Sequence, residues 1–267
     1  MPISTPAPGR PMALEFRSVT KVFPTPSGED LVAVRDVSFS VNEGEFVAVV
    51  GPSGCGKSTL LSMTAGLYQP TEGEVRVSGR PVTRPNAHVG FMLQKDLLLP
   101  WRNILSNIEF GLEARGVPRA ERRARAMQEL RHCQLEGFDR QYPYQLSGGM
   151  RQRAALARTL AIDPEIILLD EPFSALDAQT KLLLQNSFAR TIAEAGKTTL
   201  LITHDLAEAV LMSDRILVLS ERPGRVVAEI AVELPHRDAP IRRRLMPEVN
   251  AYAAELFRHL RLEERAA

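Results

Sequence analysis

The sequence predicts an α/β fold with a mainly parallel β-sheet, an antiparallel β subdomain and an inserted helical subdomain. Two runs, Phe46–Val50 and Ile166–Leu169, are apolar at every position, as expected of parallel strands that are covered on both faces. A helix-forming stretch follows each of them, which is the alternation of an α/β domain. The segment from about residue 95 to 162 instead has helical character and no convincing strand.

The composition is that of an ordinary globular chain. Its 267 residues are 44% hydrophobic and 24% charged, with a formal net charge of +1, so no electrostatic footprint for nucleic acid is expected. Cys55 and Cys133 are the only cysteines, which predicts free thiols and a reducing compartment. No apolar run approaches the roughly 20 residues that a membrane span needs, and the N-terminus lacks the order of a signal peptide.

The chain begins with residues 1–12, a proline-rich stretch that we expect to be a disordered tail. Leu14–Val22 and Leu31–Val41 then alternate apolar and polar residues and should pair as the antiparallel layer. Phe23 ends the first of these strands. An aromatic ring there suits either simple packing or stacking against a nucleobase, and residue type leaves both open.

The remaining elements follow from periodicity and end signals. Further strands are expected at Glu74–Ser78, Val89–Leu93, Thr199–Thr203, Ile216–Leu219 and Val226–Val232. Further helices are expected at Arg119–Cys133, Met150–Ala161 and Ala178–Ala195, with a short one after His204-Asp205. A C-terminal helix should carry Leu245, Val249, Tyr252, Leu256 and Leu260 on one side, and Pro247 should kink or restart it. The arginines of 119–125 are interrupted by Glu121, which favours a solvated helix face over a nucleic-acid surface.

The densest signal is the run Gly51-Pro52-Ser53-Gly54-Cys55-Gly56-Lys57-Ser58-Thr59, which fits Gly-x-x-x-x-Gly-Lys-Ser between a strand and a helix-forming run. Glycines allow backbone N–H groups to turn around phosphates, Lys57 adds a full positive charge and Ser58 offers a hydroxyl to Mg²⁺. A plain glycine-rich turn would need neither side chain. The run predicts a P-loop that binds a nucleotide such as ATP together with Mg²⁺.

A P-loop alone leaves kinases, GTPases and motors open. Asp170 and Glu171 end a buried strand, where they should lie beside the P-loop. Asp170 would then hold Mg²⁺ from the side opposite Ser58, and Glu171 would polarise the water that attacks the γ-phosphate. Taken by themselves, the two acids could equally be solvated charges at a strand end.

Ser147-Gly148-Gly149 is a second small-residue turn that opens a helix, and it has the makings of another anion site. One nucleotide does not need two such sites in one chain. The turn therefore suggests an active site formed between two subunits, in which Ser147 to Gly149 face the γ-phosphate held by the other. The turn could also be an ordinary N-cap.

These stretches together resemble a known family. The Q-loop, signature, Walker B, D-loop and H-loop of ABC transporter ATPase subunits are matched in order by Gln94, Leu146–Arg153, Ile166–Pro172, Ser174–Asp177 and Ile202–Asp205. The resemblance covers roughly residues 13 to 235 and implies an ABC ATPase domain over 13–235 with a C-terminal helical extension over 236–267. Met150 departs from the signature, where Gln is most frequent, but the serine and glycines that should touch phosphate are present.

The resemblance implies further roles. Phe23 would stack on adenine, and Asp177 would belong to the nucleotide-binding set. Gln94 would sense Mg²⁺ and the γ-phosphate. His204 would hold the γ-phosphate and orient Glu171, which would place Glu171, His204, Gln94 and Lys57 in the catalytic machinery and Ser58, Gln94 and Asp170 around the metal.

A narrower resemblance, through Leu98–Arg102, the Gly-Gly-Met signature and Arg222–Arg225, is to the importers of nitrate, sulfonate and taurine. It implies a second ATPase subunit in a homodimer, membrane permease subunits, an indirect link to a periplasmic or extracellular substrate-binding protein and a peripheral place on the cytoplasmic face of the membrane. Non-transport ABC ATPases of DNA repair usually carry a long coiled coil between P-loop and signature, and translation factors usually carry two cassettes. A small-molecule kinase would leave the Ser147 turn and His204 unexplained.

The run Leu97–Trp101 directly follows the Q-loop residue and has neither helical nor alternating periodicity. Its side chains cannot all be buried against one surface by regular structure. Either the run packs inside the helical subdomain, or part of it stays exposed and docks a helix of the permease, with Trp101 as an anchor.

Overall fold

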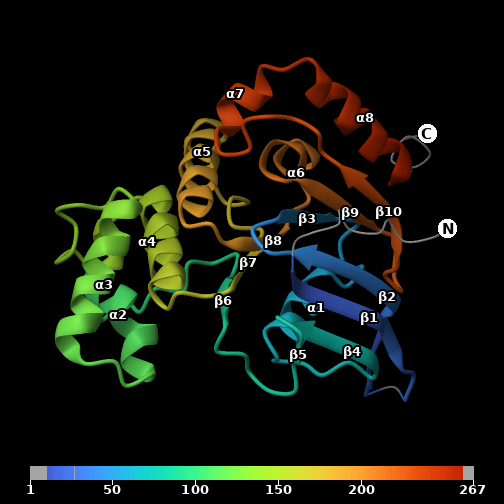
Figure 1. Ribbon diagram of the computed structural model, residues 1–267, viewed down its shortest axis with the longest axis horizontal. Helices are drawn as coiled ribbons and strands as arrows, with labels where there is room; N and C mark the ends of the chain where they lie inside the picture. The colour runs from blue at the N-terminus through green and yellow to red at the C-terminus, as the bar shows by residue number, and fades with distance from the viewer. Residues whose placement is uncertain (1–10, 27, 261–267) are drawn as a thin grey trace.

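The computed structural model describes residues 11–26 and 28–260. Most of the sequence expectation for a tail at residues 1–12 therefore lies outside the described residues, and Met12 already belongs to the first strand. The chain forms two β-sheets with helices around them and a helical lobe at one side (Figure 1). Among the described helices, none is both long and apolar enough to cross a membrane.

The smaller sheet has four strands in the order β2-β1-β4-β5. These are β1 (Met12–Phe23), β2 (Leu31–Asn42), β4 (Glu72–Val77) and β5 (Arg80–Pro81). Each neighbouring pair is antiparallel, with Phe16 opposite both Phe39 and Val75. This confirms the expected antiparallel layer.

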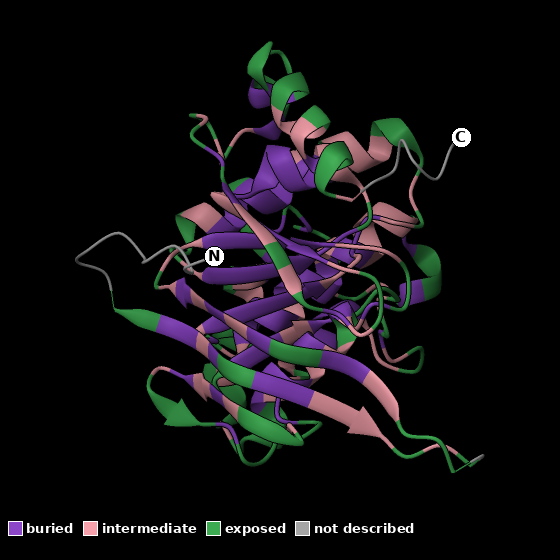
Figure 2. Ribbon diagram, turned by 90° about the vertical axis from the view of Figure 1, so that its right-hand side faces the viewer, coloured by how far each residue is buried: buried purple, intermediate pink, exposed green. Residues whose placement is uncertain are grey.

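The larger sheet has six strands in the order β10-β9-β3-β8-β7-β6. Their bounds are β3 (Phe46–Val50), β6 (Val89–Met92), β7 (Ile166–Asp170), β8 (Thr198–Ile202), β9 (Arg215–Leu219) and β10 (Val226–Ala231). All neighbouring pairs are parallel except β10 with β9. The sheet is therefore mainly parallel, as the continuous apolar runs predict. In Figure 2 its inner strands are mostly buried, while exposed residues lie on helices, on loops and on parts of the smaller sheet.

The central strand β3 shows how the two cores form. Its side chains alternate between the faces of the sheet, and every one of them is buried. Val47 and Val49 join the core between the two sheets, where helix α1 (Lys57–Thr64) contributes Leu61. Ala48 and Val50 join the core on the opposite face, under the remaining helices. Helix α1 begins at Lys57, so the last residues of the P-loop motif form its first turn.

The helical lobe comprises α2 (Ile104–Ala114), α3 (Arg119–His132) and α4 (Gly148–Ala161), which lie on one side of the sheets in Figure 1. Asn103 caps α2 by accepting a hydrogen bond from the backbone N–H of Ser106 at 2.8 Å. At the start of α3, Arg119, Arg123 and Arg125 are exposed, and Arg125 pairs with Glu121 at 2.6 Å. Arg122 instead turns toward Glu109 of α2, 3.8 Å away. Apart from Arg122, this is the solvated helix face that the charge pattern favours.

After α4, the described part of the chain contains the helices α5 (Ala178–Glu194), α6 (Leu206–Met212), α7 (Pro240–Arg244) and α8 (Glu248–His259). Pro247 stands immediately before α8, so the helix restarts there, as the sequence predicts. One expectation is wrong: Leu245 is 83% exposed and lies in the turn between α7 and α8, whereas Val249 and Leu256 are buried. The turn at Pro247 interrupts the period that would have put these side chains on one face.

Candidate nucleotide-binding site

The P-loop connects β3 to α1 and takes backbone conformations that need glycine. Gly54 and Gly56 have φ angles of 76° and 100°. A Cβ atom on Gly56 would lie 2.4 Å from Val34 Cγ1 and 2.9 Å from the Ala33 carbonyl oxygen of β2. The loop is therefore pressed against the antiparallel sheet, and its shape leaves the N-terminus of α1 open to an anion.

The Lys57 side chain folds back over the P-loop and is held by backbone carbonyls of the same loop. Its side chain is 7% exposed, and its ammonium donates hydrogen bonds to the carbonyl oxygens of Gly51 at 2.7 Å and Pro52 at 2.8 Å. An ammonium has three donors. These two bonds use two of them, and the third is directed at the Cys55 sulfur, a weak acceptor 3.9 Å away. The arrangement positions a full positive charge beside the loop that should receive the phosphates.

Ser58 and Asp170 meet across the cleft. The Ser58 hydroxyl donates to Asp170 Oδ1 at 3.3 Å, which joins the first turn of α1 to the end of β7. Burial raises the pKa of the Asp170 carboxyl above its ordinary value, while the bond from Ser58 acts in the opposite direction. A hydroxyl and a carboxylate at this separation are the oxygen ligands that Mg²⁺ takes together with phosphate oxygens. This pair fits the ion.

The chain turns sharply at Glu171, directly after β7, because Glu171 has a left-handed backbone conformation. Its φ is 48°, and its backbone N–H donates to the Ile202 carbonyl oxygen of β8 at 2.9 Å. The turn brings Glu171 Oε2 to 3.1 Å from Nδ1 of His204, which follows β8. The adjacency of β7 and β8 thus brings together an acid and an imidazole that are 33 positions apart.

Gln94 joins the same region from the end of β6. Its side-chain amide donates to the Ser174 hydroxyl at 3.1 Å, and that hydroxyl donates to the Glu171 carbonyl oxygen at 3.0 Å. Gln152 of α4 in turn donates to the Gln94 carbonyl oxygen at 3.3 Å. These contacts link Glu171 to the segment after Gln94, which leads into the helical lobe.

A cleft of about 390 Å³ opens over the P-loop. Its lining is formed by Phe23, Leu31, Ala33, Ser53, Gly54, Gly56, Lys57, Ser58, Thr59, Glu171 and Arg222. Phe23 packs edge to face on Tyr68 with ring centroids 5.3 Å apart, and the Lys21 ammonium lies 4.9 Å from the Phe23 centroid. The volume lies within the range of small-ligand pockets. Arg222 was not among the nucleotide-binding residues predicted from the sequence.

The Ser147 turn lies apart from this cleft. Ser147 caps α4 by accepting a bond from the Met150 N–H at 3.4 Å, and Asp177 caps α5 by accepting one from Thr180 N–H at 3.0 Å. The hydrogen bond from the Thr180 N–H lowers the pKa of Asp177. A Cβ atom on Gly149 would lie 3.2 Å from Thr180 Cγ2, so the two caps are neighbours. Neither Ser147 nor Asp177 is among the described residues that line the cleft.

The run after Gln94 divides between the two alternatives raised by its sequence. Leu98 is buried, whereas Leu97 and Trp101 are 53% and 72% exposed. Arg158 fixes the backbone of the run, because its guanidinium donates to the carbonyl oxygens of Asp96 and Leu97, both at 2.7 Å. Part of the run therefore packs into the lobe, and part forms an apolar surface next to the site.

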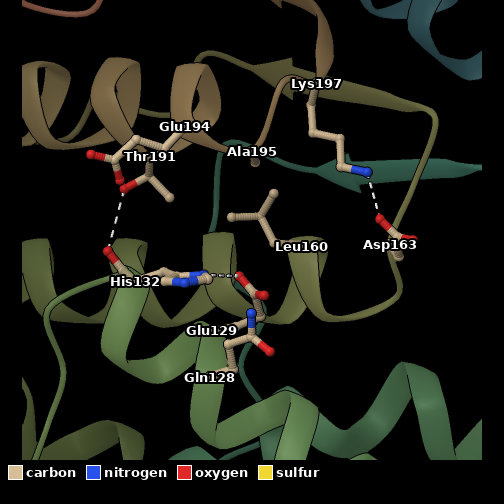
Figure 3. A pocket seen from close by; sticks show the side chains of 9 residues that line it. All are labelled: Gln128, Glu129, His132, Leu160, Asp163, Thr191, Glu194, Ala195 and Lys197. Atoms are coloured by element: carbon tan, nitrogen blue, oxygen red, sulfur yellow. Dashed lines mark hydrogen bonds and ion pairs between the residues drawn. The ribbon is translucent and has the colours of Figure 1, made fainter.

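A second hollow, of about 320 Å³, lies where α3 of the lobe meets the ends of α4 and α5 (Figure 3). Its charged groups already have partners. His132 lies 3.3 Å from Glu129, Lys197 lies 2.5 Å from Asp163, and Glu194 pairs with Arg190 outside the hollow. None of the predicted site residues lines it, so it is separate from the P-loop cleft.

The fold and the cleft define a P-loop nucleotide-binding protein. Residues 34–174 match the model of the ABC transporter family. An uncharacterized ABC transporter ATP-binding protein of Methanocaldococcus jannaschii is 48% identical over 83% of this chain and 82% of its own length. The taurine import ATP-binding protein TauB of Burkholderia thailandensis is 48% identical over 78% of this chain and 80% of its own.

Solved structures agree. The dimeric post-hydrolysis state of the ATP-binding cassette MJ0796, bound to ADP and Pi, aligns with a TM-score of 0.71 and 35% identity, covering 83% of this chain and 99% of that one. The chain belongs to the ABC transporter family as an ATP-binding, ATP-hydrolysing subunit. This confirms the fold class and the ATPase activity that the motif set predicts.

Proposed function

We propose that this chain hydrolyses ATP for an ABC importer of a small anion such as nitrate, a sulfonate or taurine. It works as a peripheral subunit on the cytoplasmic face of the membrane, with permease subunits and indirectly with a substrate-binding protein. The observation that carries the importer assignment is the 45–48% identity to proteins named as taurine import ATP-binding proteins. The cleft over the P-loop, lined by Glu171 with His204 in contact behind it, supports the ATPase part.

In this proposal each polar group of the cleft has a task. Ser58 and Asp170, with Gln94, hold Mg²⁺, which when bound neutralises charge on the phosphate chain. Lys57 binds the phosphates. Glu171 accepts the proton of the attacking water, and His204 orients Glu171 through the 3.1 Å contact between them.

The role of Glu171 is tested by Glu171→Gln. The amide keeps the shape but cannot accept the proton, so ATP hydrolysis should fall by about 10²- to 10⁴-fold while ATP binding persists. Glu194→Gln, at the second hollow, is the matched control and should leave both quantities unchanged. Wild-type turnover by a folded Glu171→Gln protein would reject the assignment.

The proposed active site is shared by two subunits, because Ser147 lies outside the cleft of its own chain. Mixing Lys57→Ala with Ser147→Arg subunits tests the arrangement. A mixed dimer has one site with both lesions and one with neither, so the mixture should recover hydrolysis that each variant lacks alone. A mixture as inactive as its components would contradict a shared site.

The cargo and the permease partner are tested by reconstitution. Permease subunits, the substrate-binding protein and this chain are combined in vesicles, and uptake of taurine, an alkanesulfonate and nitrate is compared. ATP-dependent uptake of one of them supports the proposal, and ATP hydrolysis indifferent to all three overturns the anion assignment.

Trp101→Ala should lose permease association without losing ATP binding, since the exposed Trp101 is the proposed docking anchor.

A further inference from the structure

The loop over residues 220–225, between β9 and β10, is fixed to the rim of the nucleotide cleft. The Gly224 N–H donates to the Ala33 carbonyl oxygen at 3.0 Å, and the Gly224 carbonyl accepts from the Arg35 N–H at 2.9 Å. A Cβ atom on Gly224 would lie 2.0 Å from the Cys55 carbonyl oxygen. Only a glycine allows this approach, so the loop is held between β2 and the P-loop.

This attachment places Arg222 in the cleft. Lys57 and Arg222 are the two cations among the described residues that line it. The Lys57 ammonium already donates to two backbone carbonyls. Within the described part of the chain, the Arg222 guanidinium has no hydrogen bond or ion pair, although it is exposed at the mouth of the cleft. Its full donor capacity is therefore available to a ligand.

The ligand of this cleft carries its negative charge on the phosphate chain. A guanidinium presents planar, paired donors that match phosphate oxygens, and it keeps its charge at any working pH. We propose that Arg222 contacts the phosphate chain of the bound nucleotide, as a second cationic ligand beside Lys57. The β9–β10 loop is then a part of the nucleotide site that the P-loop motif does not contain.

The test measures the Kd of Mg²⁺-ADP for the full chain by isothermal titration, at low and at high NaCl. Arg222→Gln should raise the Kd about tenfold at low salt, the order expected when one charge-assisted phosphate contact is removed. The difference should shrink at high salt, because mobile ions screen an exposed charge. Arg222→Lys should recover part of the affinity, since it restores the charge without the planar donors.

Arg225→Gln is the matched control, because Arg225 is an exposed arginine of the same loop that does not line the cleft. It should bind Mg²⁺-ADP like the wild type. A wild-type Kd in Arg222→Gln would overturn the proposal. An equal loss in Arg225→Gln would overturn it too, because it would assign the effect to the general charge of the loop. So would a loss in Arg222→Gln that is independent of salt and not improved by lysine.

Discussion

Lys57 and Arg243 are both cations buried in this chain and held by backbone carbonyl oxygens, but they are held to different extents. Lys57 has two such bonds and is 7% exposed. Arg243 is 1% exposed and donates five, to carbonyls at the end of α6 and in the segment leading to α7. A buried cation held by five fixed backbone carbonyls is structural. Lys57 is held by only two, and its third donor faces the weak acceptor Cys55 Sγ at 3.9 Å, so a phosphate oxygen can replace that contact.

The largest expected effect is on Arg243. Arg243→Met removes the donor shared by five carbonyl oxygens in a buried place, where each unsatisfied group is costly. The free energy of unfolding should fall by about 3–5 kcal/mol, because several buried carbonyl oxygens lose their donor at about 1–3 kcal/mol each. Urea unfolding followed by circular dichroism measures it, with the exposed neighbour as control in Arg242→Met. A loss of stability no greater than that of Arg242→Met would show that Arg243 does not have a structural role.

The contrast also explains what the sequence can predict. Gly51 to Thr59 form a contiguous motif, and Asp170 and Glu171 stand directly after a recognisable strand, so their place beside each other follows from strand order. Local spacing predicts such sites. It also predicts the two sheets, because each strand carries its own burial pattern.

Arg222 and Arg243 show where that reasoning ends. In the sequence, Arg243 is the middle of three arginines, which reads as an exposed charge run. Its burial depends on the way α7 packs back onto α6 from 30 positions away. Arg222 reaches the cleft because β9 lies next to β3 in the sheet and Gly224 bonds to β2. Both placements depend on contacts between segments far apart in the sequence, so no local motif predicts them.

The second prediction concerns Lys57, and it is smaller in energy. Lys57→Ala should weaken ATP binding by about 10- to 100-fold, the equivalent of one or two charged hydrogen bonds. The two carbonyls left behind belong to Gly51 and Pro52, which are partly exposed and can be hydrated. The free energy of unfolding without nucleotide should therefore change by less than about 1 kcal/mol. Nucleotide titration and urea unfolding of the same preparation check both parts. Unchanged ATP affinity, or a stability loss like that of Arg243→Met, would contradict the distinction between Lys57 as a ligand-binding cation and Arg243 as a structural one.

A half-buried cation, Lys181, gives the smallest and most specific test, because its acceptors titrate. The Lys181 ammonium lies 2.8 Å from Asp205 and 2.9 Å from Glu208, and Gln185 also donates to Glu208 at 2.9 Å. Burial raises the pKa of Glu208, with Lys181 and Thr203 opposing and Asp205 reinforcing the rise. The pKa of Asp205 is lowered in spite of its desolvation, chiefly by its hydrogen bond from Lys181. The two carboxylates therefore titrate in separate ranges.

The sign of the pH dependence follows from these directions. Between the unfolded pKa of Glu208, about 4.3, and its raised folded value, the folded chain binds more protons, so stability falls as the pH rises through that window. Asp205 adds stability above its unfolded pKa and loses it only in stronger acid, below the window. Glu208→Gln removes the first contribution and keeps the second. The melting temperature of the wild type minus that of Glu208→Gln should therefore be larger at pH 4.5 than at pH 7, with Glu194→Gln showing no such trend. A difference that is constant, or larger at pH 7, would mean that Lys181 stabilises the Glu208 carboxylate more than burial destabilises it.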